Sequence, residues 1–211
     1  MTYIIDPCCK EKQLTELLDE IEGKHKIAED KEGNPIYVNK ANVAHFYSYS
    51  DWDLNFMLPF FVNRTPCGEV TLCMVQIEQS VLETARKLLA RMIPHPETRE
   101  PVYLVKHMSI ITRGDNRKEI LGALKGFGDR LTVCEDTIGF RCLTCANEHR
   151  QFVVQGSINQ RPLSVTQMYT ITTGQKLYEQ AQGLLDSKVK VKRIADWEEA
   201  YERLVKQSEN L

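Results

Sequence analysis

Most features that assign a chain to a special class are missing from this sequence. No apolar run approaches the roughly 20 residues that a membrane-spanning helix needs. The opening residues, MTYIIDPCCKEKQ, lack the basic region and apolar stretch of a signal peptide. The formal net charge is only -2, so no overall field attracts polyanions. We therefore expect a cytoplasmic protein without a membrane partner, in which nucleic-acid binding would need a local basic patch.

The sequence also lacks internal repeats, low-complexity tracts and an even set of cysteines. Seven cysteines are present, and reduced thiols are the simplest interpretation for a chain with no secretory leader. They are Cys8, Cys9, Cys67, Cys73, Cys134, Cys142 and Cys145. A disulfide framework is therefore not expected.

What is present is the composition of an ordinary globular protein, with 42% hydrophobic and 27% charged residues over 211 positions. Strand and helix patterns alternate from 43 to 136, which predicts parallel pairing in an α/β domain. We assign residues 1–40 to an N-terminal extension with a helix over 13–22, and residues 41–211 to the α/β domain. The expected strands are 43–50, 69–77, 102–112, 131–134 and 165–172, with an edge strand over 188–194. The expected helices are 52–62 capped by Asp51, one capped by Ser80, 117–126, 174–185 and 196–207, and residues 93–101 are expected to form a loop.

The segment FRCLTCANEHRQFVVQGSIN, residues 140–159, predicts a strand, a polar turn, a second strand and a Gly-Ser-x-Asn corner. This layout resembles the catalytic hairpin of the phospholipase D superfamily, in which a His-x-Lys strand precedes an acidic turn and a Gly-Ser-x-Asn ending. The corner is present as Gly156, Ser157 and Asn159. In the following run, QRPLSVTQMYTI, Gln167 falls near the Glu of the family.

The chain departs from the family at the residues that carry its chemistry. Phe140 and Cys142 stand where the His and Lys should be, and the acidic position falls near Ala146 or Asn147. In the family, the His attacks phosphorus, while the Lys and Asn stabilise the oxygens. The resemblance therefore implies no catalytic residue here.

The resemblance implies a phospholipase D-like domain, with a mostly parallel sheet, flanking helices and a C-terminal β-hairpin motif. It also implies a non-catalytic role, in which Gly156, Ser157, Asn159 and Gln167 bind a phosphate-bearing ligand or nucleic acid without a cofactor. A homodimer that pairs the motifs across a two-fold axis is a further expectation. The alternatives are a divergent phosphodiesterase or nuclease, a thiol-dependent hydrolase, and an assembly module that keeps the fold for shape alone.

Two further patterns have competing interpretations. Cys142, Cys145 and His149 spell a C-x-x-C-x-x-x-H pattern, but strand alternation would point the two cysteines to opposite faces, so we expect no bound zinc. Cys142 as a nucleophile would need His45, His107 or His149 as its base. The basic stripe Lys188, Lys190, Lys192 and Arg193 is either a solvated edge or a phosphate-backbone contact.

Overall fold

A computed structural model gives the arrangement of most of the chain. The residues that it describes are 2–5, 10–24, 26–32, 34–37, 42–48, 53–95, 97–113, 117–135, 141–156, 167–186 and 190–193. Their α-helices are α1 (Lys10–Ile21), α2 (Leu54–Val62), α3 (Gln79–Ala90), α4 (Arg117–Leu124) and α5 (Gln175–Asp186), with a 3-10 turn at Gly128–Arg130. The first strands are β1 (Thr2–Ile5), β2 (Lys26–Glu29), β3 (Pro35–Tyr37), β4 (Val43–Ser48), β5 (Gly68–Cys73), β6 (Met92–Pro94) and β7 (Pro101–Tyr103). The others are β8 (Val105–Thr112), β9 (Leu131–Glu135), β10 (Cys142–Ala146), β11 (Gln151–Gly156), β12 (Gln167–Thr173) and β13 (Lys190–Arg193).

Nine of these strands form one sheet in the order β1-β4-β12-β11-β10-β5-β8-β9-β13. The neighbours β1 and β4, β5 and β8, and β8 and β9 are parallel, and the other five pairs are antiparallel. It follows that six strands share one direction, while β10, β12 and β13 run the opposite way. The mixed α/β class with flanking helices is confirmed, and the sheet is mostly parallel by strand direction although not by neighbour pairing.

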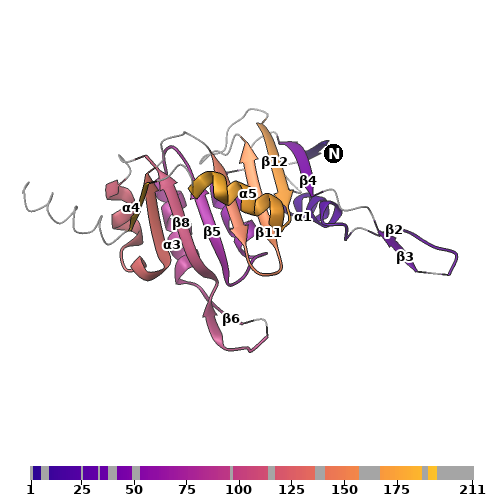
Figure 1. Cartoon of the computed structure of the whole chain (residues 1–211), viewed down its shortest axis with the longest axis horizontal. Coiled ribbons are helices and arrows are strands. Elements are labelled where there is room, and N and C mark those ends of the chain that lie inside the picture. Colours follow the sequence, from indigo (N-terminus) through magenta and orange to yellow (C-terminus); the bar gives the residue numbers. More distant parts are fainter. Residues whose placement is uncertain are drawn as a thin grey trace, which may run out of the picture.

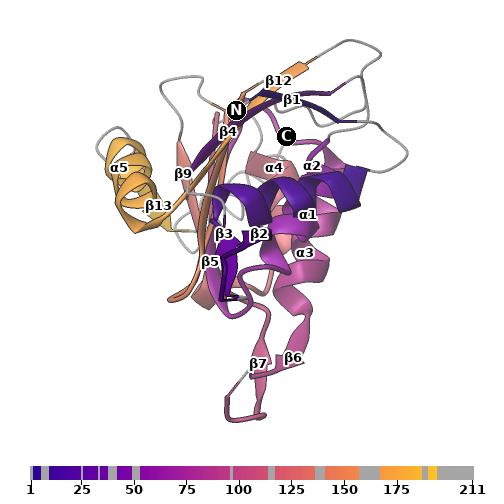
Figure 2. The same cartoon turned by 90° about the vertical axis from the view of Figure 1, so that its right-hand side faces the viewer.

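The helices cover the two faces of this sheet unequally. Figure 2 shows α5 on one side and α1, α2, α3 and α4 on the other. The main core lies on the four-helix side, where apolar residues of β5 and β8 such as Leu72 and Ile110 are fully buried. A smaller core on the α5 side contains Cys73, Cys142 and Leu185. The side chain of Gln182 fastens α5 to the sheet by donating to Thr144 Oγ1 at 2.9 Å.

The hairpin expected within 140–159 is confirmed over the described residues 141–156. Strands β10 and β11 pair antiparallel from Cys142 opposite Gln155 to Ala146 opposite Gln151, and residues 147–150 make the turn. The Asn147 carboxamide oxygen holds this turn by accepting the backbone N–H of His149 at 3.0 Å and of Arg150 at 2.8 Å. Asn147 is thus a turn-forming side chain at the position where the hairpin needs one.

The N-terminal residues are joined to the same sheet and core. Strand β1 pairs with β4, and the apolar stripe of α1, including Leu14 and Leu18, is buried in the main core. At the end of α1, the Glu22 carboxylate accepts a hydrogen bond from Arg150 Nε at 3.1 Å. This ion pair fastens the first helix to the hairpin turn.

Three local expectations are wrong. Asp53, rather than Asp51, caps α2 by accepting the Phe56 N–H, because the helix begins two residues later than expected. Helix α3 begins at Gln79, so Ser80 lies inside its first turn and does not cap it. Strands β6 and β7 pair as a projecting two-stranded arm, where the prolines had led us to expect a loop over 93–101 (Figure 1).

Of the two elements expected at the C-terminus, the structure describes only the edge strand. Strand β13 lies at the edge of the sheet beside β9, as the alternation of lysines predicted. The helix expected over 196–207 lies outside the described residues. None of the helices within the described part of the chain combines the length and the apolarity needed to cross a membrane.

The Glu22–Arg150 ion pair makes the stability of the fold depend on pH. Burial alone would raise the pKa of Glu22, but the hydrogen bonds and charges of Arg150 and Lys24 outweigh it and hold this pKa below its ordinary value. A folded-state pKa below the unfolded one stabilises the fold above the unfolded value of about 4.3. That contribution is lost as pH falls through the folded pKa.

We predict that Glu22→Gln lowers the free energy of unfolding at pH 7 by about 1.5–3 kcal/mol, because it removes a charge-assisted hydrogen bond. The difference from wild type should shrink as pH falls below about 4. Urea denaturation across pH measures both effects. Glu16→Gln is the matched control, since its pairing with Lys12 is exposed and long at 3.9 Å. Equal effects of the two substitutions would contradict the prediction.

Candidate functional site

Two of the residues that the resemblance singles out, Cys142 and Gly156, lie near one edge of the sheet. Strands β4, β5, β8, β9 and β11 all end at this edge, which we call the carboxyl edge, and β10 and β12 begin there. Cys142 lies opposite Gln155, the residue before Gly156, and the backbone of Gln167 lies two residues beyond Tyr169, which is opposite Gly156. Phe140, Ser157 and Asn159 lie outside the described residues. Open α/β sheets bind ligands beyond the carboxyl ends of their strands.

Gly156 ends β11 in a conformation that other residues rarely adopt. Its φ is +132°, and a Cβ atom added there would clash with the Met168 carbonyl oxygen of the neighbouring strand. Two separate constraints therefore require glycine at the first position of the Gly-Ser-x-Asn corner. Gly156 lies at the carboxyl edge, at the end of β11.

Cys142 is a buried, neutral thiol. It is 0% exposed and lies in the smaller core beside Cys73. Burial, followed by the effect of Cys73, raises the pKa of the Cys142 thiol far above its ordinary value. Cys142 thus supplies neither a cation to phosphate nor a thiolate for attack.

The metal interpretation of Cys142 and Cys145 fails for the reason that alternation predicted. Cys145 belongs to the main core on the opposite face of the sheet, and burial raises the pKa of its thiol as well. His149 lies in the hairpin turn, at the other end of β10 from Cys142. The three side chains cannot share one ion.

The histidines considered as bases are also far from Cys142. His107 pairs with Glu69 on β5, whereas Cys142 pairs with Cys73, four residues or roughly 13 Å further along that strand. His45 is separated from Cys142 by three strand spacings, roughly 14 Å. Each ring is instead hydrogen-bonded to a threonine hydroxyl at 2.9 Å, His45 to Thr170 and His107 to Thr132.

An exposed cation that the sequence reasoning passed over lies beside the corner. Arg141 is exposed and immediately precedes β10, so continuing the hairpin register places its backbone opposite Gly156. Arg113, also exposed, directly follows β8 at the same edge, about 10 Å away across two strand spacings. The signal that could have revealed this cation in the sequence is the position of Arg141, directly before Cys142.

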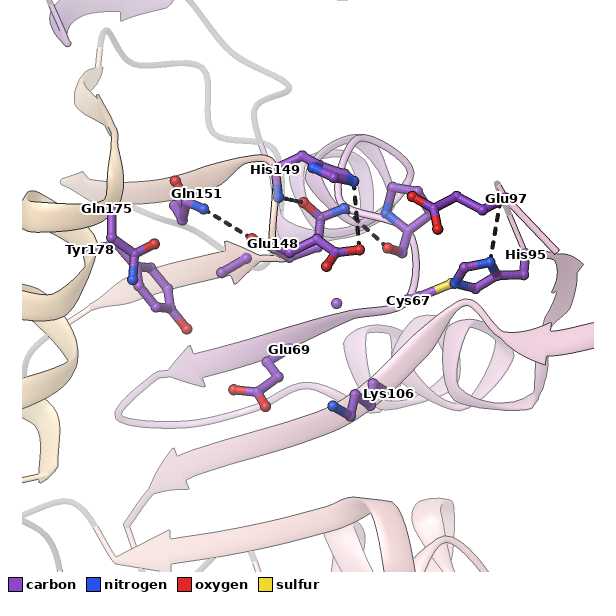
Figure 3. Close-up of a pocket in the computed structure, with 14 residues that line it drawn as sticks. Cys67, Glu69, His95, Glu97, Lys106, Glu148, His149, Gln151, Gln175 and Tyr178 are labelled. Atoms are coloured by element: carbon purple, nitrogen blue, oxygen red, sulfur yellow. Dashed lines mark hydrogen bonds and ion pairs between the residues drawn. The ribbon is translucent and has the colours of Figure 1, made fainter.

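A cavity lies at the opposite edge, which we call the amino edge. It has a volume of about 490 Å³ and lies beside the hairpin turn and the projecting arm (Figure 3). The charged and titratable side chains that line it include Glu69, His95, Glu97, Lys106, Glu148 and His149. The lining has three carboxylates and one lysine, so the cavity carries a net negative charge, which repels phosphate.

Sequence reasoning did not find this cavity because its residues come from separate segments. Glu97 lies between β6 and β7, Glu69 is on β5, and Glu148 and His149 are in the hairpin turn. Their spacing in the chain follows no motif. Only the sheet topology brings them together.

The comparisons with known proteins do not assign a family. No protein-family model matches the chain, and no curated protein matches it. Among solved structures, the chain is similar to polyphosphate kinase from Porphyromonas gingivalis, with 14% identity and a TM-score of 0.39 over 75% of this chain. The matched part is 26% of the kinase, so this chain spans about a quarter of that protein's length. At this TM-score the likeness carries no argument about fold or function.

We predict that Gly156→Ala lowers the free energy of unfolding by about 1–3 kcal/mol, because the side chain strains the backbone and meets the Met168 carbonyl. Gly183→Ala, in α5, is the control. Nothing lies within 4 Å of a Cβ added there, so helix propensity should stabilise this variant by up to about 1 kcal/mol. Urea denaturation compares them, and a Gly156→Ala protein as stable as wild type would refute the constraint.

Proposed function

We propose that this chain is a non-catalytic, phospholipase D-like α/β module that binds a phosphate-bearing ligand at the carboxyl edge. The observation that carries the proposal is the exposed Arg141 beside the glycine-requiring corner of Gly156. In this arrangement, Arg141 supplies the positive charge that Cys142 lacks, and Ser157 and Asn159 supply neutral donors. Single-stranded nucleic acid is the ligand class that we propose, since Arg113 provides a second cation along the same edge.

The fold supports the proposal through its order of elements. From β4 to α5 the chain has the alternating strands and helices, then the hairpin, strand and helix that the resemblance implied, with the β6–β7 arm inserted before β8. The buried thiol of Cys142 supports a non-catalytic role, because it cannot act as the missing cation or attack phosphorus. The homodimer implied by the resemblance stays a prediction.

A thiol-dependent hydrolase has less support than ligand binding. Four of the described cysteines, Cys73, Cys134, Cys142 and Cys145, are buried. Cys67 lines the acidic cavity, but burial and the charge of Glu148 raise the pKa of its thiol. A nucleophilic cysteine needs the opposite environment, in which positive charge lowers the thiol pKa.

We predict that a labelled single-stranded oligonucleotide binds the chain with an affinity that falls as salt rises. Arg141→Ala and Asn159→Ala should each weaken binding by roughly 10- to 100-fold, the loss expected for one contact to a charged group. Arg86→Ala, an exposed arginine on α3, is the matched control and should bind as wild type. Fluorescence anisotropy gives the affinities. A wild-type protein that does not bind, or an equal loss in Arg86→Ala, would refute the site.

We further predict that the metal-free protein does not turn over bis-(p-nitrophenyl) phosphate or single-stranded DNA. Loss of a single transition-state contact commonly costs a factor of about 100–1000, and this site also lacks the attacking histidine. Phe140→His with Cys142→Lys should not restore activity, because the acidic support near Asn147 is absent. Activity that Asn159→Ala or Ser157→Ala abolishes would show that the chain is an enzyme.

A further inference from the structure

Two segments that are remote in the sequence place metal-binding side chains together in the acidic cavity at the amino edge. Glu97 comes from the loop of the β6–β7 arm, and Glu148 and His149 come from the β10–β11 turn. One ligand atom from each residue lies within 4.8 Å of the other two. Figure 3 shows Glu148 and His149 side by side on the turn, with Glu97 facing them from the arm.

One of the three separations, between Glu148 and His149, matches that of a zinc site. Zinc–nitrogen and zinc–oxygen bonds are about 2.0–2.2 Å long, so two ligands of a tetrahedral ion lie roughly 3.4 Å apart. His149 Nε2 and Glu148 Oε1 are already 3.5 Å apart. All three side chains are exposed, and the ligand atom of Glu97 lies within 4.8 Å of those of Glu148 and His149.

The charge of the cavity also favours a cation. Glu69, Glu97 and Glu148 line it with Lys106 as the one lysine or arginine among its described lining residues. A divalent cation held by two of these carboxylates would relieve their mutual repulsion. Imidazole beside carboxylate suits zinc better than magnesium, which prefers oxygen ligands and retains its water.

The turn and the arm each hold their ligands in place. Asn147 accepts the N–H of His149 and of Arg150, and its own side-chain NH₂ donates to the Pro66 carbonyl at 3.1 Å. On the arm, His95 Nδ1 accepts the backbone N–H groups of Glu97 and Thr98 at 3.3 Å. This hydrogen bonding leaves the proton of a neutral His95 ring on Nε2, so His95 is a positioning residue and not a ligand.

We propose that Glu97, Glu148 and His149 bind one Zn²⁺ ion, which links the projecting arm to the hairpin turn. A water molecule from the cavity completes the tetrahedron, as in zinc sites with three protein ligands. The site lies at the opposite edge from Arg141 and Gly156, so it stands or falls independently of phosphate binding.

The test is calorimetric titration of the chelator-treated full chain with Zn²⁺. We expect one site per chain, and His149→Ala and Glu97→Gln should each weaken it by at least about 10- to 100-fold. His45→Ala, an exposed histidine on β4, and Glu119→Gln, an exposed glutamate on α4, are the matched controls and should bind as wild type. Circular dichroism confirms that each variant is folded.

Two more measurements identify the ligands independently of affinity. Co²⁺ in place of Zn²⁺ should show d–d absorption without a thiolate charge-transfer band, and Zn²⁺ should slow proteolysis of the 97–100 loop in wild type but not in His149→Ala. A thiolate band would assign the metal to cysteines and overturn the proposal. Failure of wild type to bind Zn²⁺, or wild-type affinity in both ligand variants, would also overturn it.

Discussion

The backbone ladder of the β10–β11 hairpin is the constraint on which the rest of this structure depends. The hairpin occupies the middle of the nine-stranded sheet, between β12 and β5. It therefore joins β1, β4 and β12 on one side to β5, β8 and β9 on the other. Every residue of β10 is buried, as expected of a central strand covered on both faces. Alternation along β10 sends Cys145 into the main core and Cys142 into the smaller one. A one-residue slip would exchange these two sets of side chains.

The same ladder separates two edges of opposite chemical character. At one end of the hairpin, β10 begins at Cys142 and β11 ends at Gly156, and the exposed Arg141 lies beside them. At the other end it closes in the Asn147 turn, which carries Glu148 and His149 into an acidic cavity. The hairpin is about 13 Å long between its terminal pairs, so a ligand of either charge meets only one of these surfaces. The ion pair of Glu22 and Arg150 fastens the turn end of the hairpin to the end of α1. At the other end, the conformation of Gly156 and the pairing of β11 with its neighbours hold the hairpin in place.

Much of the fold could be predicted because its elements follow local periodicity. The stripe over Leu14, Leu17, Leu18 and Ile21 predicted α1, and the apolar run in β5 predicted a strand covered on both faces. The arm at 92–103 was missed because prolines dominate it and its strands have three residues each, too short for a period to be seen. The caps of α2 and α3 were misplaced because several polar residues precede each helix, and only backbone geometry selects one.

The sequence by itself determined most of the helices and longer strands, the hairpin and its turn, the glycine at position 156, and the absence of the His-x-Lys pair. These properties depend on neighbouring residues and on residue type alone. The tertiary structure decided that Cys142 is a neutral buried thiol, that Arg141 lies beside Gly156, and that Glu97 meets His149. Each of these depends on the solvation of a side chain or on the distance between segments remote in the chain. Sheet order sets both quantities, and no local pattern in the sequence encodes it.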